Sequence, residues 1–130
     1  NNMNNIFGIG TDIVNISRIK SALNKNKNLK KKIYSSNEIK ITEVKFNKIA
    51  SYAKKFAAKE AFSKALGTGV SQGISFNEIS INNNIQGKPY IELLGKTKLI
   101  VSRTLKKKYK VLLSISDEKK YALAMVVISY

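Results

Sequence analysis

The first apolar stretch of the chain, residues 6–14, is rich in β-branched residues and bounded by polar ones, which predicts a strand. Side chains two positions apart share one face of a strand, so Gly8, Gly10 and Asp12 lie on the same face. The pattern predicts that the opposite, apolar face packs inward. The face that bears the two glycines is bare, and such a face lets another backbone or a ligand approach closely.

A short helix is predicted directly after this strand, with Asn15 or Ser17 as its N-cap. The buried side of this helix consists of Ile16, Ile19 and Leu23. The lysine-rich residues 24–32 predict a solvated helix end or loop. A capping box of Ser35 and Glu38 then predicts a further helix start.

Helical spacing continues from this capping box through Phe46 and Ile49. The strongest helix pattern covers about residues 47–66, and Gly67 is a natural C-terminal stop. Within this helix a small residue recurs every fourth position, at Ala53, Ala57, Ala61 and Ala65. This stripe predicts close packing against a neighbouring element.

Strand patterns dominate the second half of the chain. Four strands are predicted in two pairs, each joined by a turn: residues 78–82 with 90–94, and residues 111–116 with 121–128. A poorer helical pattern covers residues 96–109. We therefore predict one α+β domain over residues 6–130, with an antiparallel sheet packed on a long central helix, after a disordered N-terminal extension at residues 1–5.

Composition limits the chemistry that the domain can perform. The 130 residues include no cysteine and no histidine, which excludes disulfides, thiolate and imidazole metal ligands, and the usual general base near neutral pH. Acid–base or metal chemistry therefore falls to Asp, Glu and Lys. No apolar run approaches the ~20 residues of a membrane-spanning helix, and the polar start lacks the features of a secretory signal. We expect a soluble cytoplasmic protein with no membrane partner.

The formal net charge of +16 is large for this length and attracts anions such as nucleic acids, acidic proteins or phosphorylated cofactors. Nearly all of the basic residues are lysines, since only Arg18 and Arg103 are arginines. The abundance of Lys, Asn and Ile also fits AT-rich coding, which would add lysine without a functional purpose. Both explanations of the charge remain open at this point.

Two of the eight acidic residues stand in unusually apolar surroundings, Asp12 at the end of the first strand and Glu60 inside the most apolar helix. Burial of a lone carboxylate is costly unless a cation or donors satisfy it. One explanation is an i,i+4 ion pair between Glu60 and Lys64. The other is a magnesium ion, which takes oxygen ligands and often binds through one or two carboxylates together with substrate phosphates.

Several of these segments together resemble the holo-[acyl-carrier-protein] synthase family, the small bacterial phosphopantetheinyl transferases. The resemblance is carried by the motifs GIGTDIV at residues 8–14, FAAKEAFSKALGTG at 56–69, GKP at 87–89, SIS at 114–116 and YA at 121–122. It covers nearly the whole chain, and the 56–69 motif is long and highly specific.

This resemblance implies a phosphopantetheinyl-transferase fold that assembles as a homotrimer, with each active site between two subunits. It implies a magnesium-dependent enzyme that transfers 4'-phosphopantetheine from coenzyme A to a serine of apo-acyl carrier protein. The products would be holo-acyl carrier protein, which serves fatty acid biosynthesis, and adenosine 3',5'-bisphosphate.

The resemblance also implies roles for single residues. Asp12 and Glu60 match the metal ligands, and Lys64 matches a lysine at the pyrophosphate; these three form the predicted catalytic set. The predicted coenzyme A contacts are Ser63, Lys64, Gly67, Thr68, Gly69, Gly87, Lys88, Pro89, Ser116 and Asp117. Arg18 and Lys25 are expected to bind the acidic carrier protein.

Three positions depart from the family pattern, and we expect them to tune affinity without changing the reaction. Asp117 stands where histidine is usual, Lys55 replaces a common arginine, and Asn15 stands where many members carry an acid. Two rival functions fit the sequence less well. A nucleic-acid-binding module fits the charge but leaves Asp12 and Glu60 unexplained, and a catalytically inactive carrier-protein binder conflicts with the intact catalytic set.

Overall fold

The structure is a computed structural model that describes residues 5–67 and 73–130. Its elements in chain order are β1 (Ile6–Asn15), α1 (Ile16–Lys25), α2 (Leu29–Ile33), α3 (Ser36–Glu43), α4 (Lys48–Leu66), a 3-10 turn η2 (Phe76–Glu78), β2 (Ile79–Asn83), β3 (Pro89–Leu93), α5 (Gly95–Leu105), β4 (Lys110–Asp117) and β5 (Tyr121–Ser129). The predicted α+β class with antiparallel pairing is confirmed. Within the described residues, no helix has the length and apolar character needed to cross a membrane.

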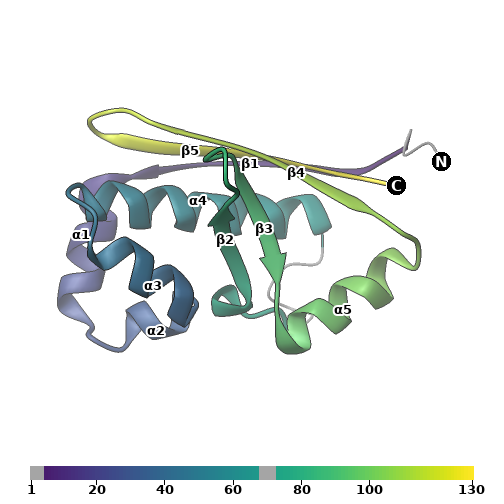
Figure 1. Cartoon of the computed structure of the whole chain (residues 1–130), viewed down its shortest axis with the longest axis horizontal. Helices are drawn as coiled ribbons and strands as arrows, with labels where there is room; N and C mark the ends of the chain where they lie inside the picture. Colours follow the sequence, from purple (N-terminus) through teal and green to yellow (C-terminus); the bar gives the residue numbers. More distant parts are fainter. Residues whose placement is uncertain (1–4, 68–72) are drawn as a thin grey trace.

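Two antiparallel sheets and the helix α4 make up the framework. The larger sheet has the order β1-β5-β4, and β2 pairs with β3 in a separate hairpin. The long helix α4 lies along one face of the larger sheet, and the β2–β3 hairpin runs across α4, in front of the helix in this view (Figure 1). The helices α1 to α3 gather at one end of the molecule and α5 lies at the other (Figure 1).

The glycine face of β1 is the buried one, so the prediction that the apolar face packs inward was wrong. A Cβ atom at Gly8 would lie 1.8 Å from the carbonyl oxygen of Ala65, and a Cβ atom at Gly10 would lie 1.8 Å from that of Ala61. Two strand residues advance about 6.6 Å and four helical residues about 6 Å, so the glycine and alanine repeats match along the interface. The bare face therefore admits the backbone of α4.

The opposite face of the larger sheet is apolar and exposed. Ile9 and Ile13 of β1 are 60% and 64% exposed, and they pair across the strands with Val127 and Leu123 of β5. The other exposed apolar side chains of this sheet are Ile6, Leu112, Tyr121 and Met125. We call this surface the outer sheet face.

Local signals placed most element ends correctly. The Asn15 side chain accepts hydrogen bonds from the backbone N–H groups of Ser17 and Arg18, and Gly67 ends α4 with a φ of 89°. The capping box at the start of α3 is also present. The helical spacing predicted through Phe46 was wrong, because α3 ends at Glu43 and the Phe46 side chain is fully exposed in the connection to α4.

The N-terminal boundary differs from the expectation by one residue. Asn5, which was assigned to the extension, exchanges two backbone hydrogen bonds with Tyr130 at 3.0 and 2.9 Å. Residues 1–4 lie outside the described part of the chain, so their predicted disorder stays a prediction.

Candidate active site

The structure brings together Asp12 of β1 and Lys64 of α4, the two elements that face each other. The Lys64 Nζ atom lies 3.2 Å from Asp12 Oδ1 and donates a hydrogen bond of 3.0 Å to the carbonyl oxygen of Thr11. Asp12 is largely covered, with 16% of its side chain exposed, whereas 55% of the Lys64 side chain is exposed. The next inward position after the two glycines of β1 therefore holds a carboxylate beside a solvent-accessible cation.

Glu60 lies in the same electrostatic environment. Partial burial is the main cause that raises the pKa of its carboxyl, the negative charge of Asp12 raises it further, and Lys64 opposes the rise. Among the described residues, Lys64 forms its ion pair with Asp12 and none with Glu60. The i,i+4 ion pair that the spacing suggests is thus absent there, and Lys64 acts on Glu60 only through its charge.

This donor set fits the magnesium ion that the family resemblance implies. Two carboxylates that repel each other in a partly desolvated place would be relieved by a divalent cation between them. No cluster of three or more acidic side chains is present in the described residues. A hard cation held here would complete its shell with water and phosphate oxygens, which is the usual way magnesium binds.

A basic cavity of about 230 Å³ lies beside the first turns of α4. Its walls are formed by Lys45, Ser51, Lys54, Lys55, Ile81, Asn83, Gly87, Pro89 and Ile115. We call it the lysine cavity. Three ammonium groups around one small space favour an anionic ligand such as a phosphate.

The charges of the lysine cavity are poorly compensated by the protein itself. Burial lowers the pKa of Lys55 to about 8; Glu38 opposes this, and Lys45 and Lys54 lower the pKa further. Lys55 donates a hydrogen bond of 2.9 Å to Ser51. Asp117, the residue that replaces histidine, lies 3.3 Å from Lys54 and so takes up part of this positive charge.

The other predicted coenzyme A contacts are spread over several places. Gly87 and Pro89 line the lysine cavity, whereas Lys88 lines a neighbouring space between β3 and β4. Ser116 and Asp117 line a shallow cavity on the outer sheet face. Ser63 is buried in α4 and Gly67 caps that helix, while Thr68 and Gly69 lie outside the described residues.

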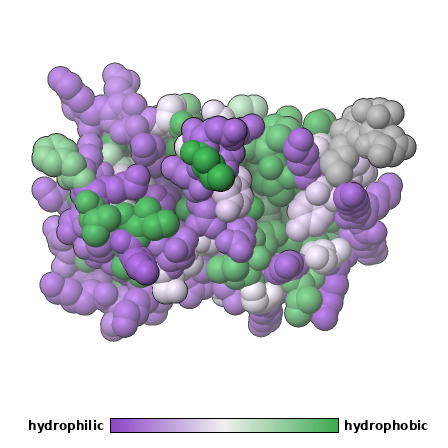
Figure 2. Space-filling view, in the orientation of Figure 1, coloured by the Kyte–Doolittle hydropathy of each residue, from purple (hydrophilic) through white to green (hydrophobic). Residues whose placement is uncertain are grey.

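Arg18 and Lys25, the residues predicted to bind the carrier protein, are both exposed on α1. Because α1 begins directly after β1, this helix starts close in sequence to Asp12. Hydrophilic residues cover most of the face shown in Figure 2, with smaller apolar areas between them.

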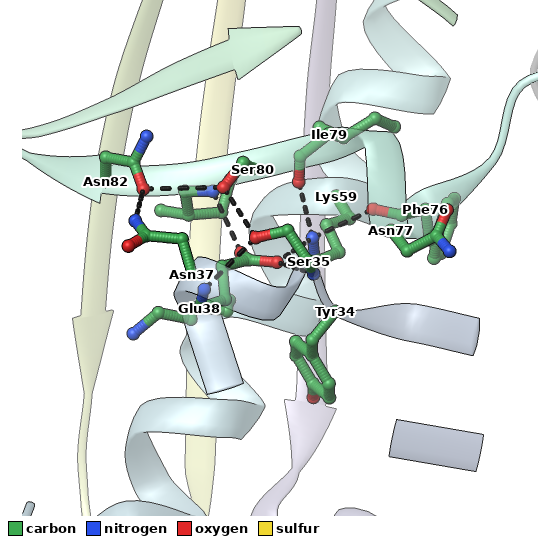
Figure 3. A network of polar contacts seen from close by, with 12 residues as sticks. Tyr34, Ser35, Asn37, Glu38, Lys59, Phe76, Asn77, Ile79, Ser80 and Asn82 are labelled. Carbon is green, nitrogen blue, oxygen red and sulfur yellow. Dashed lines mark hydrogen bonds and ion pairs between the residues drawn. The ribbon is translucent and has the colours of Figure 1, made fainter. Parts of the chain in front are cut away.

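Two features of the site were missed in the sequence. The first is the cluster of lysines around the lysine cavity, of which the sequence pattern singles out only Lys55. The second is a fully buried ion pair between Glu38 and Lys59, whose nitrogen and oxygen lie 2.7 Å apart (Figure 3). Lys59 could have been found by the reasoning that singled out Glu60, because both are charged residues within an alanine-rich helix.

Comparison with known proteins supports the resemblance seen in the motifs. The family model described as the 4'-phosphopantetheinyl transferase superfamily matches residues 8–126. The holo-[acyl-carrier-protein] synthase of Pelagibacter ubique (strain HTCC1062) is 46% identical over 124 residues, which are 95% of this chain and 96% of the relative. The synthase of Buchnera aphidicola subsp. Schizaphis graminum is 48% identical over 124 residues, covering 95% and 97%.

Solved structures agree with this assignment. The holo-[acyl-carrier-protein] synthase of Neisseria meningitidis superposes with a TM-score of 0.86 at 36% identity, over 96% of this chain and 99% of that one. The Bacillus anthracis enzyme, solved in complex with CoA (3',5'-ADP), gives a TM-score of 0.78 at 34% identity, over 96% and 97%. With its motifs, its sequence relatives and its fold in agreement over nearly the full length, the chain belongs to the holo-[acyl-carrier-protein] synthase family of 4'-phosphopantetheinyl transferases.

Proposed function

We propose that this protein transfers the 4'-phosphopantetheine group of coenzyme A to a serine hydroxyl of an apo-acyl carrier protein and releases adenosine 3',5'-bisphosphate, in the service of fatty acid biosynthesis. The observation that carries the proposal is that Asp12 of β1 lies beside Glu60 and Lys64 of α4, with Lys64 in contact with Asp12 and the charges of both Asp12 and Lys64 acting on Glu60. Relatives named for this activity, and relatives solved with coenzyme A, support it.

In this proposal Asp12 and Glu60 would hold one magnesium ion, which when bound would neutralise charge on the pyrophosphate of coenzyme A. Lys64 adds a positive charge next to the same phosphates, where its exposed ammonium group can reach a ligand. The serine oxygen forms the new bond to phosphorus while the bond to the oxygen of the adenosine bisphosphate breaks. The serine proton passes to a carboxylate or a water of the site, because the chain has no histidine.

The lysine cavity is proposed to bind a phosphate of coenzyme A. Lys45, Lys54 and Lys55 offer three cations there, and Gly87 with Pro89 forms another part of the wall. A phosphate in this space would relieve the repulsion among the ammonium groups. It would also raise the pKa of Lys55, because an adjacent negative charge favours the protonated amine.

The outer sheet face is proposed as the contact surface of a homotrimer. Its exposed isoleucines lie opposite apolar residues of β5, which makes a continuous apolar strip on a sheet that has no covering element in the described residues. Large exposed apolar surfaces of this kind mark interaction sites. Closed cyclic symmetry would bury the strip, and Asp117 at its edge would then lie near the neighbouring subunit.

Mass spectrometry of the carrier protein tests the proposed activity. An apo-acyl carrier protein incubated with this enzyme, coenzyme A and magnesium should gain the mass of one phosphopantetheine group, and a carrier with its acceptor serine changed to alanine should gain none. The variants Asp12→Asn and Glu60→Gln keep side-chain size and should lose at least about 100-fold in rate. Absence of the adduct with the folded wild-type enzyme would refute the proposal.

A further inference from the structure

The buried Glu38–Lys59 ion pair involves the residue directly before Glu60, but it lies on the side of α4 that faces α3, η2 and β2. Both side chains are fully buried, and the ammonium nitrogen lies 2.7 Å from Glu38 Oε1. Lys59 also donates hydrogen bonds to the carbonyl oxygens of Phe76, at 2.9 Å, and Ile79 (Figure 3). All three N–H groups of the ammonium are thereby used, and their acceptors come from α3, η2 and the start of β2.

Glu38 is held as firmly as its partner. Its Oε1 atom also accepts a hydrogen bond of 2.8 Å from the backbone of Ser35, and its Oε2 atom accepts one of 2.8 Å from Ile81 in β2. The pair therefore connects α3, the β2 strand and α4 through directional bonds. Burial of a charged pair is expensive, and hydrophobic residues would often stabilise a core equally well, so the pair calls for an explanation beyond stability.

The two sides of α4 restrain the helix differently. On the β1 side the contacts join Gly8 and Gly10 to the backbone at Ala61 and Ala65. Such contacts set the distance between helix and strand. The long side chain of Lys64 on this side bonds to Thr11 and Asp12 but is 55% exposed, whereas Lys59 is fully buried. On the other side, the three fixed acceptors of Lys59 define one rotation of the helix about its axis.

Glu60 follows Lys59 directly, so the two side chains point about 100° apart around the helix. A carboxylate lies about 6 Å from the helix axis, and a rotation of 20° would displace it by about 2 Å. A misplacement of about 1 Å can cost roughly 100-fold in rate. We propose that the Glu38–Lys59 pair is a positioning device, which fixes the rotation of α4 and thereby holds Glu60 toward Asp12. The inference rests on the proposed metal-binding role of those carboxylates.

The test compares single and double variants. Lys59→Met or Glu38→Gln alone leaves one polar partner buried without its counterpart, and each should lower the unfolding temperature. The double variant Glu38→Gln with Lys59→Met removes both charges. Its unfolding temperature should therefore return most of the way to that of the wild type. A Ser80→Ala variant is the matched control, because the Ser80 hydroxyl contacts Ser35 at 2.8 Å in the same network, and neither residue belongs to α4.

Two readouts then separate positioning from stability. Backbone amide NMR shifts of Gly10, Asp12 and Glu60, recorded without metal, should move in the folded double variant and stay unchanged in Ser80→Ala. Manganese binding measured by electron paramagnetic resonance, with coenzyme A present, should weaken about 10-fold or more in the double variant only. If the double variant does not fold, Glu38→Asp, which keeps the charge but shortens its reach, is measured in the same way.

A folded double variant with wild-type amide shifts and wild-type manganese affinity would overturn the inference, since the pair would then serve stability alone. Failure of the proposed function looks different. If the wild-type protein itself binds no manganese, the metal site is refuted, while the amide shifts still decide whether the ion pair orients Glu60 relative to Asp12.

Discussion

The Lys64 ammonium group lies 3.2 Å from Asp12 Oδ1, although 52 residues separate the two in sequence. This contact makes Lys64 a competitor of any metal ion for Asp12 as long as no phosphate is bound. Once coenzyme A is bound, the same ammonium group would serve the phosphates. The residue should therefore oppose metal binding in the free enzyme and assist the reaction in the loaded one.

We predict that Lys64→Met tightens manganese binding to the free enzyme and slows transfer. Loss of the partly exposed cation beside Asp12 should be worth about 1 kcal/mol, or roughly five-fold in metal affinity. Loss of the Lys64 positive charge beside the transferred phosphate should lower kcat about 100-fold. Calorimetric metal titration without coenzyme A and steady-state kinetics measure the two effects. Weaker metal binding in Lys64→Met would contradict this account.

Asp117 is predicted to weaken coenzyme A binding through its contact with Lys54. The carboxylate lies 3.3 Å from that lysine and repels phosphate. We expect Asp117→His or Asp117→Asn to lower the KM for coenzyme A by roughly five-fold, about 1 kcal/mol, without changing the KM for the carrier. Glu118→Gln is the matched control, because Glu118 is the next acidic residue of the turn and forms no ion pair within the described residues. If all of these variants had the wild-type KM for coenzyme A, Asp117 would only shape the turn.

Arg18 is predicted to bind the acidic carrier protein. Reversal of its charge in Arg18→Glu should raise the KM for the carrier about ten-fold, reduce its salt dependence, and leave the KM for coenzyme A unchanged. Arg103→Glu supplies the control, since Arg103 is the other arginine of the chain and is exposed on α5 at the far end of the molecule (Figure 1). An equal effect of both variants would indicate only a general influence of net charge.

The outer sheet face is predicted to hold the homotrimer together. A charged residue in its centre, as in Met125→Lys or Ile13→Lys, should lower the mass in solution from three times the chain mass of 14.5 kDa toward that of one chain, with loss of activity. Leu99→Lys changes an apolar residue that is 57% exposed on α5 and should leave assembly intact. Light scattering measures the mass, and an active wild-type monomer would refute the assembly.

Glu43 is predicted to contribute stability that depends on pH. Hydrogen bonds from Lys30, Tyr52 and Lys48 lower the pKa of its carboxyl to about 2. Because the folded pKa is below the unfolded one, this contribution is present above about pH 4.5 and is lost as pH falls toward 2. Glu43→Gln should cost about 1 kcal/mol near pH 7, after allowance for solvent screening, and almost nothing near pH 2.

Denaturant unfolding of the two proteins at several pH values measures this difference. Glu92→Gln is a suitable comparison, since Glu92 is exposed and lies in no ion pair among the described residues. The lowered pKa of Glu43 would be contradicted as the cause if the difference in free energy of unfolding between wild type and Glu43→Gln did not narrow as the pH falls.

Much of the local structure was determined by the sequence itself. The capping box of Ser35 and Glu38 and the stop at Gly67 were predicted correctly, and of the two candidate N-caps, Asn15 and Ser17, the structure uses Asn15. Such signals act over one turn of backbone, so the residues that form them are neighbours in the chain. The motif residues 56–69 were also sufficient to identify the family.

Only the tertiary structure decided which partner each face and each charge would have. Alternation in β1 distinguished two faces but did not show that α4 would select the glycine face, because that choice depends on how closely an alanine-bearing helix can approach. The sequence offered Glu60, on the same helix, as an ion-pair partner of Lys64, whereas the structure pairs Lys64 with Asp12 on a distant strand. The lysine cavity and the Glu38–Lys59 pair join residues from several elements, and periodicity along one element carries no information about contacts of that kind.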